Sequence, residues 1–162
     1  MPQVFKRRII RERVLQVLYA YEMNKENLNF LEKEILTDIP EKIDEDFAHN
    51  LINRVLIHCT ALDEMIKQRV DNWEMNRIAL IDKILLRMGI CELLYFPDIP
   101  PKVSINEVIE IAKIFSTAGS GKFINGILDT ILSELKNTGN LNKSGRGLLQ
   151  ESIRQVPDTP KK

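Results

Sequence analysis

The sequence has few of the residues that build metal centres and disulfide frameworks. Among 162 residues there are two cysteines, two histidines and one tryptophan, and aromatic residues make up 6% of the chain. Two lone cysteines suit a reducing compartment better than a disulfide framework, and their spacing builds no four-ligand metal site. His49 and His58 fall on opposite faces of one expected helix. We therefore expect no disulfide, no metal ion and no other cofactor.

The sequence also lacks a long hydrophobic run. Hydrophobic residues make up 44% of the chain, but no apolar stretch approaches the roughly 18 residues of a membrane span. No apolar stretch follows the first charges, so we expect no signal peptide. These absences predict a cytoplasmic protein without a membrane partner. The length suits one domain with a real core and is short for two.

The net charge is zero, with 23 basic and 23 acidic residues, but the charge is unevenly placed. Residues 1–13 hold five basic residues and one acidic residue, a local charge of +4. Residues 22–46 hold nine acidic residues and three lysines, a local charge of −6. The net charge of zero therefore includes a basic N-terminal segment that could bind a polyanion.

The spacing of apolar residues predicts an all-α protein. Apolar side chains recur every three or four residues, and no segment shows the sustained alternation of a strand. Ser104 and Glu107 have the spacing of a capping box, which predicts a helix start at Ser104. The Asp38–Pro40 turn and the prolines at 97–101 predict breaks between helices. The expected helices cover residues 7–21, 27–36, 44–70, 76–96, 104–115 and 120–135.

The composition changes after Lys136. Residues 138–162 are rich in Asn, Gly, Ser, Lys and Pro and contain no aromatic residue. Such a segment buries too little apolar surface to offset the entropy lost on ordering. We therefore expect one helical domain over residues 1–137 and a disordered tail over residues 138–162. The alternative is a single docked turn that includes Leu148, Leu149 and Ile153.

The first expected helix carries its cations on both sides of a buried stripe. On a helical wheel, three arginines share an arc of about 100°, a tyrosine continues that arc, and two further cations lie on the other side. Clustered cations contact phosphates, and Arg and Tyr can also stack on unpaired bases. The alternative is a solvated helix start that pairs with the acidic 22–46 segment. The candidate RNA-binding residues are Lys6, Arg7, Arg8, Arg11, Arg13 and Tyr19.

The turn Gly119–Lys122 has some features of a phosphate-binding loop. The pattern fails because position 116 is Ser rather than Gly, Phe123 replaces the metal-binding Ser or Thr, and no strand precedes the turn. The turn's N–H groups and Lys122 can still seat a backbone phosphate. No Ser/His/Asp or Cys/His arrangement is evident. We therefore predict that the protein is not an enzyme and has no small-molecule substrate.

The second half of the chain contains a series of short motifs that together resemble one family. In this order they resemble the NusB family of transcription antitermination factors, and the resemblance covers roughly residues 5–136. The start, Arg7-Arg8-x-x-Arg11-Glu12 with Leu18-Tyr19, resembles the same family. The motifs are Ile84-Leu85-Leu86-Arg87, Glu92-Leu93, Ile99-Pro100, Val103-Ser104-Ile105-Asn106-Glu107, Glu110-Ile111-Ala112-Lys113 and Lys122-Phe123-Ile124-Asn125-Gly126-Ile127-Leu128-Asp129.

The resemblance implies two small helical bundles, with six to seven helices, that bind single-stranded boxA RNA of ribosomal RNA leaders. The implied protein partner is the small-subunit ribosomal protein that doubles as NusE. In the transcription elongation complex the pair would help RNA polymerase to read through terminators. By position, Lys122 and Phe123 would join the basic start in contacting RNA, and Asp82 would face the basic protein partner. Gly126 would allow two helices to approach closely.

Two other functions remain open at this stage. The same helical module also precedes ribosomal RNA cytosine methyltransferases, so the chain could be a relative of that enzyme domain. It has no glycine-rich cofactor domain and could not methylate RNA by itself. The chain could also be a protein-interaction adaptor whose arginines only keep it soluble. Binding of a short single-stranded RNA would distinguish the antitermination function from the adaptor.

Overall fold

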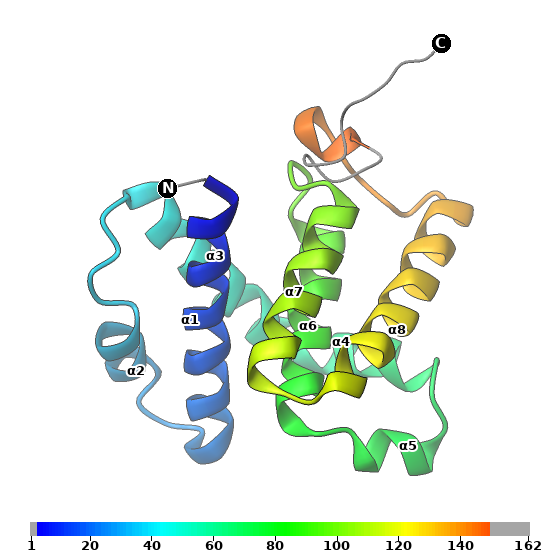
Figure 1. Ribbon diagram of the computed structural model, residues 1–162, viewed down its shortest axis with the longest axis horizontal. Helices are drawn as coiled ribbons and strands as arrows, with labels where there is room; N and C mark the ends of the chain where they lie inside the picture. The colour runs from blue at the N-terminus through cyan, green and yellow to red at the C-terminus, as the bar shows by residue number, and fades with distance from the viewer. Residues whose placement is uncertain (1–2, 150–162) are drawn as a thin grey trace. The chain divides into compact units, whose positions relative to one another are not determined.

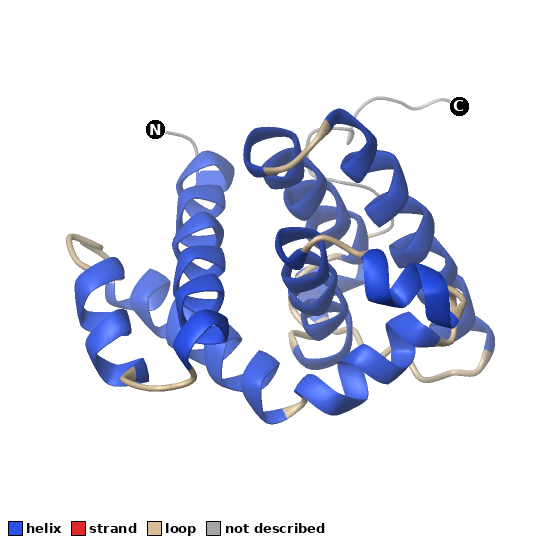
Figure 2. Ribbon diagram, turned by 90° about the horizontal axis from the view of Figure 1, so that it is seen from below, coloured by secondary structure: helices blue, strands red, loops and turns tan. Residues whose placement is uncertain are grey.

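The computed structural model describes residues 3–149, with the side chains of residues 3–6 and of residue 72 left out. Within this range the protein is all-α and has no strand, as the sequence predicted (Figures 1 and 2). The chain divides into two compact units, Met1–Arg87 and Met88–Lys162. The elements are α1 (Gln3–Asn24), α2 (Leu28–Ile35), α3 (Lys42–Ile57), α4 (Cys59–Lys67), α5 (Asn72–Arg77), α6 (Leu80–Tyr95), α7 (Pro101–Phe115), α8 (Ala118–Asn137) and the 3-10 helix η1 (Gly145–Leu148).

In the first unit α1 packs against α2 and α3 (Figure 1). Its buried stripe has the helical spacing that the sequence predicted, because Ile10, Val14 and Val17 follow one another at intervals of four and three residues and Leu18 lies four residues after Val14. Arg87, in the middle of α6, contacts acidic side chains of two other helices. The Arg87 guanidinium donates to both oxygens of Asp63 at 2.7 and 2.9 Å and lies 3.7 Å from Glu22. The α1 stripe consists of Ile10, Val14, Val17 and Leu18.

In the second unit α7 packs against α8 (Figure 1), and side chains of both helices contact the C-terminal half of α6. Gly89 on α6 marks the closest approach, because a Cβ there would lie 2.9 Å from Leu128 Cδ1. Ser104 of α7 donates to the buried Glu92 carboxylate at 2.6 Å, which pairs two polar groups inside this core. The aliphatic core side chains include Met88, Ile90, Leu93, Ile105, Val108, Ile111, Ile124, Leu128 and Ile131.

The structure has more helices between residues 44 and 96 than the sequence predicted. The expected helix over 44–70 is two helices, since His58 leaves the helical conformation (φ −100°, ψ 14°) between α3 and α4. The helix α5 was not predicted, although its start has a clear signal. The Asp71 carboxylate accepts from the Glu74 N–H at 2.7 Å, and the Glu74 carboxylate accepts from the Asp71 N–H at 3.2 Å. This capping box holds a helix too short for apolar periodicity to reveal.

The prediction that Ser104 caps α7 was wrong. The helix begins one turn earlier, at Pro101, and Pro100 is its N-cap. Proline fits the first turn because its missing N–H has no partner there in any case. Ser104 therefore lies inside the helix, where its hydroxyl bonds to Glu92 instead of to its own backbone.

Residues 138–149 are ordered in the described structure, although the composition predicted disorder from residue 138 onward. The helix α8 ends in a Schellman motif, in which Gly139 (φ 74°) and Asn140 donate to the carbonyls of Lys136 and Leu135. The Lys143 ammonium then donates to the Phe96 and Glu92 carbonyls at the end of α6, at 2.8 and 3.0 Å. Leu148 and Leu149 belong to this docked segment, whereas Ile153 lies outside the described residues.

Candidate nucleic-acid interface

Two of the predicted RNA-binding arginines of α1 lie against one aromatic ring of α3. The Arg7 guanidinium is 4.2 Å from the centroid of the Phe47 ring, and that of Arg11 is 5.2 Å away. Arg7 Nε also donates to Asp44 Oδ1 at 3.1 Å. The Asp44 side chain is 2% exposed, while that of Arg7 is 24% exposed. Arg7 is therefore a partly exposed cation held in place by a buried carboxylate and a ring, and Arg11 is buried.

Three further predicted residues of α1 lie in different environments. Arg13 donates to the Ile35 and Thr37 carbonyls at 3.1 and 3.0 Å, so it satisfies the C-terminal end of α2. Arg8 is half-buried. Burial raises the pKa of Glu12, and Arg8 and Arg13 oppose this shift. Tyr19 is 38% exposed, which leaves ring surface for stacking.

Lys6 belongs to α1, but its side chain lies outside the described residues. The cations of α1 are thus unequal. Arg7, Arg8 and Arg13 are half-buried and reach the surface in part, whereas Arg11 is buried.

The second group of candidates lies in the first turns of α8. Lys122 is exposed, and Phe123 is half-buried. The hydroxyls of the preceding turn pair with one another, since Ser120 Oγ lies 2.9 Å from Ser116 Oγ and 3.1 Å from Thr117 Oγ1. The N-terminal end of α8, which is the positive end of the helix dipole, thus has an exposed lysine and a partly exposed ring nearby. Such groups can bind a phosphate and stack on a base.

The expectation that Gly126 allows close helix packing was wrong. Gly126 is exposed, and a Cβ at this position would meet nothing within 4 Å. Asn125 beside it is exposed as well. Asp129, one turn further on, lies 3.7 Å from Lys102 of α7. The face of α8 that carries Lys122 and Asn125 is therefore polar surface and is not part of the helix packing.

Asp82, the predicted protein-partner residue, lies in the first turn of α6 and is 7% exposed. A carboxylate there is stabilised by the positive end of the helix. Little of its side chain reaches solvent, so its predicted partner contact would depend on the groups around it.

Three residues with contacts relevant to binding were not among the predicted site residues. Asp44 and Phe47 were not predicted as site residues, because their contacts with α1 link residues far apart in the chain. Trp73 is 65% exposed and carries the Arg77 guanidinium 4.5 Å from its ring centroid. Trp73 is the single tryptophan of the chain and stands in a polar stretch, so the sequence alone could have indicated it as a candidate interface residue. Exposed Trp and Arg side chains are typical centres of macromolecular interfaces.

Within residues 3–149, no group of three or more His, Cys, Asp or Glu side chains could hold a metal ion. Burial raises the pKa of the Cys59 thiol, which makes it a poor nucleophile. In the same range, no helix has the length and apolar character to cross a bilayer. Over the described residues the fold is all-helical, and the candidate functional groups are cations and rings at helix surfaces.

The chain belongs to the NusB family, whose model matches residues 8–133. Proteins named Transcription antitermination protein NusB are similar to it over most of their length. The one from Chloroherpeton thalassium is 46% identical over 98% of this chain and 79% of its own length. The one from Salinibacter ruber is 46% identical over 88% of this chain and 91% of its own. These names designate a transcription factor, in agreement with the prediction that the protein is not an enzyme.

Solved structures show the same fold. The structure of T. maritima NusB has a TM-score of 0.74 and 36% identity, and covers 83% of this chain and 92% of its own. A structure of antitermination factors NusB and NusE in complex with dsRNA has a TM-score of 0.71 at 24% identity, and covers 83% of this chain and 99% of that chain. These likenesses agree with the predicted all-α fold, although the helix count exceeds the expected six to seven.

Proposed function

We propose that this protein is a transcription antitermination factor that binds boxA-type ribosomal RNA leader sequence together with the ribosomal protein NusE. In the cytoplasm, as part of the transcription elongation complex, the pair would let RNA polymerase read through terminators. The similarity to relatives named as antitermination proteins over 88–98% of this chain carries the proposal. The exposed cations and rings of α1 and α8 supply the chemistry that RNA binding needs.

RNA would contact residues of α1 and, in the second unit, residues of the start of α8. Arg7, Arg8 and Lys6 of the first unit and Lys122 of the second unit would contact phosphates. Tyr19 and Phe123 would stack on bases. Arg11 and Arg13 would act from inside the unit, because their guanidinium groups hold Phe47 and the end of α2.

Filter binding of the purified chain to RNA tests this proposal. The probes are a short single-stranded boxA-type RNA, a scrambled strand of equal length and a duplex of the same sequence. Phe123→Ala should weaken binding of the boxA strand by about 1–3 kcal/mol, because base stacking on a ring has this worth. Ile114→Ala is a matched control, since this side chain is 64% exposed and not a candidate. If the Phe123→Ala and Ile114→Ala variants bind the boxA strand with equal affinity, Phe123 has no stacking role.

The protein partner would contact the start of α6 around Asp82. Asp82→Asn keeps the shape of this buried side chain and removes its charge, so it should slow association with a NusE-type protein. Surface plasmon resonance at two salt concentrations measures this rate. A rate that Asp82→Asn leaves unchanged at low salt, with the fold intact by circular dichroism, would place the partner elsewhere.

One observation favours the adaptor as a second candidate function. Arg7, Arg11 and Arg13 all make contacts inside the first unit, so part of the basic start serves the fold. An adaptor would bind the NusE-type protein and show no affinity for the boxA strand above that for the scrambled strand. The filter-binding experiment therefore separates the two functions.

A further inference from the structure

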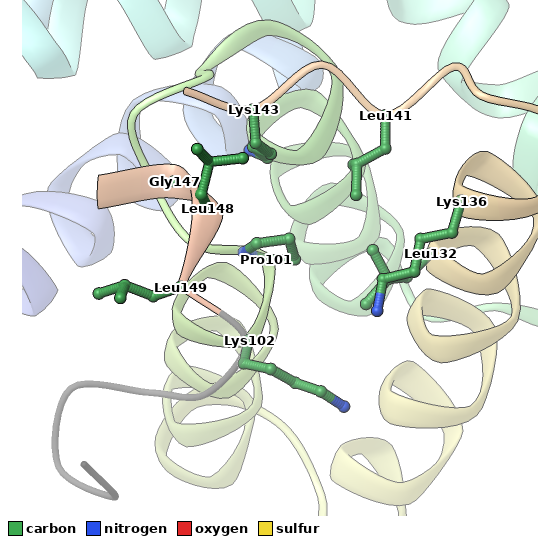
Figure 3. A pocket seen from close by; sticks show the side chains of 9 residues that line it. All are labelled: Pro101, Lys102, Leu132, Lys136, Leu141, Lys143, Gly147, Leu148 and Leu149. Carbon is green, nitrogen blue, oxygen red and sulfur yellow. The ribbon is translucent and has the colours of Figure 1, made fainter. Parts of the chain in front are cut away.

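The second unit contains a pocket of about 120 Å³ between three parts of the chain (Figure 3). Pro101 and Lys102 line it from the start of α7, and Leu132 and Lys136 line it from the last turns of α8. The third wall is the segment after α8, through Leu141, Lys143 and residues 147–149. A cavity of about 150 Å³ holds a benzene molecule, so this one accepts a branched aliphatic side chain.

The third wall consists of residues that lie outside the region matched by the family model. The family model ends at residue 133, whereas the wall consists of residues 141–149. Three contacts hold it in place. Lys143 bonds to the carbonyls that end α6, and the Ser144 N–H donates to the Pro97 carbonyl at 3.0 Å. Gly147 lies so close to Pro97 that a Cβ would overlap its carbonyl oxygen, so only glycine fits there.

The pocket is apolar inside and positive around its edge. Its charged lining residues are three lysines, and no carboxylate is among them. Asp129 lies 3.7 Å from Lys102 and balances that lysine in part. Lys136 is exposed and makes no ion pair within the described side chains. Leu148 and Leu149 are 62% and 41% exposed, so apolar surface continues outward from the pocket.

We propose that this pocket is a docking site for an acidic peptide segment of a partner protein, with one leucine-like side chain in the pocket and carboxylates at Lys102 and Lys136. This site would act beside the proposed RNA-binding function and does not require it. The lysine edge selects carboxylates, and the leucine walls select an aliphatic anchor. RNA fits less well, because no aromatic ring or arginine lines the pocket to stack on a base.

NMR titration of the full chain with a defined probe tests the site. The probe is the acetylated, amidated peptide Glu-Glu-Leu-Glu-Glu, and the signals are the amides of Lys136, Gly147 and Leu148. We expect saturable shifts at these amides, with Kd on the order of 1 mM for so short a peptide. Replacing the leucine of the probe by serine should weaken binding more than tenfold, since the buried aliphatic group is lost.

Variants of the protein separate this site from general attraction of acids to lysines. Lys136→Glu should weaken the probe about fivefold, and Gly147→Ala should remove the shifts by displacing the wall. Lys67→Glu is the matched control, because it makes the same change at an exposed lysine of α4. Equal weakening by Lys67→Glu, no leucine preference, or no shift at these amides would each overturn the proposal.

Other occupants give distinct results in the same experiment. Stronger shifts at these amides with an RNA pentamer than with the peptide would assign the pocket to RNA. If the chemical shifts of these amides change with protein concentration in the absence of the probe, a second copy of the chain occupies the pocket. Probe-free shifts in Ile153→Ser would assign it to the chain's own last residues. Each of these outcomes overturns the peptide proposal, and none of them bears on RNA binding by α1.

Discussion

Arg7 and Arg11, one helical turn apart on α1, both place a guanidinium group near the Phe47 ring. Asp44 holds the nearer one through a 3.1 Å contact. This arrangement orients a long side chain that would otherwise lose rotamer entropy on meeting a phosphate. At the residue scale, the same cation therefore contributes to the fold and remains partly available to RNA.

The neighbouring Arg7 and Arg8 should differ in their effects on stability. Arg7→Ala leaves the buried Asp44 carboxylate without its ion-pair partner, so it should lower the free energy of unfolding by about 1–3 kcal/mol. Arg8→Ala removes a half-buried surface charge and should cost less than about 1 kcal/mol. Urea unfolding followed by circular dichroism measures both. If both variants lose the same free energy of unfolding, the ion pair between Arg7 and Asp44 adds no stability of its own.

At the element scale, α7 depends on a polar contact in the core. Its helix begins at Pro101, and Ser104 of the first turns reaches the buried Glu92 carboxylate of α6 at 2.6 Å. The segment 138–149 supports the same C-terminal end of α6 through Lys143. The first contact joins consecutive helices and the second joins segments about 50 residues apart, and both satisfy polar groups that are partly or fully removed from water.

Removing the Ser104 hydroxyl tests the first contact. Ser104→Ala takes a hydrogen-bond donor from the buried Glu92 carboxylate and should lower the free energy of unfolding by about 1–3 kcal/mol. Thermal and urea unfolding measure this loss. Thr130→Ala is a control, because its exposed hydroxyl donates only to its own helix, at Gly126. A Ser104→Ala chain as stable as Thr130→Ala would contradict the role of the contact.

Lys143 gives the second contact a pH dependence. Burial lowers the pKa of this lysine to about 8, while Glu92 and Asp98 oppose the shift. Its unfolded pKa is about 10.4, so between pH 8 and 10 the unfolded chain binds more protons than the folded one. Stability from this group therefore rises with pH across that window. The neutral amine keeps two N–H donors for its two carbonyls.

The comparison with Lys143→Met isolates this effect from other titrating groups. The wild-type free energy of unfolding, relative to Lys143→Met, should grow as the pH rises from 8 to 10. Urea unfolding at several pH values measures the difference. A difference that is flat or that falls over this range would mean that Lys143 is not buried as described.

At the scale of the whole molecule, the family match spans both units, and the candidate RNA contacts are divided between them. Lys122 and Phe123 belong to the second unit, and the basic start belongs to the first. RNA binding that uses both units should therefore depend on charge from each of them.

The salt dependence of RNA affinity measures how many phosphates each unit contacts. The logarithm of affinity falls with the logarithm of salt by about 0.7 for each contact with a single strand. The double variant Arg8→Ala and Lys122→Ala should therefore lower the slope by about 1.4. Lys67→Ala, at an exposed lysine of α4, should leave it unchanged. A double variant with the wild-type slope would remove both residues from the RNA surface.

Much of the fold was predictable from the sequence because it depends on local spacing. The stripe Ile10, Val14, Val17 and Leu18 is buried as its three- and four-residue intervals predicted. The ordered motifs of the second half identified the family. The short helix α5 was not predicted, because six residues are too few to show apolar periodicity. The start of α7 was misplaced because Ser104 and Glu107 match a capping box whose side chains are in fact buried in the core.

Tertiary structure alone decided what each cation of α1 does. A helical wheel treats Arg7, Arg8, Arg11 and Arg13 as equivalent surface charges, since it contains no information on neighbouring helices. Phe47 and Asp44 of α3 and the carbonyl end of α2 make them different. Likewise, composition predicted disorder from residue 138 onward, but the hydrogen bonds of Lys143 and the glycine contact at Pro97 hold residues 143–147. The intervals between apolar residues determine helices, whereas contacts between distant residues depend on packing.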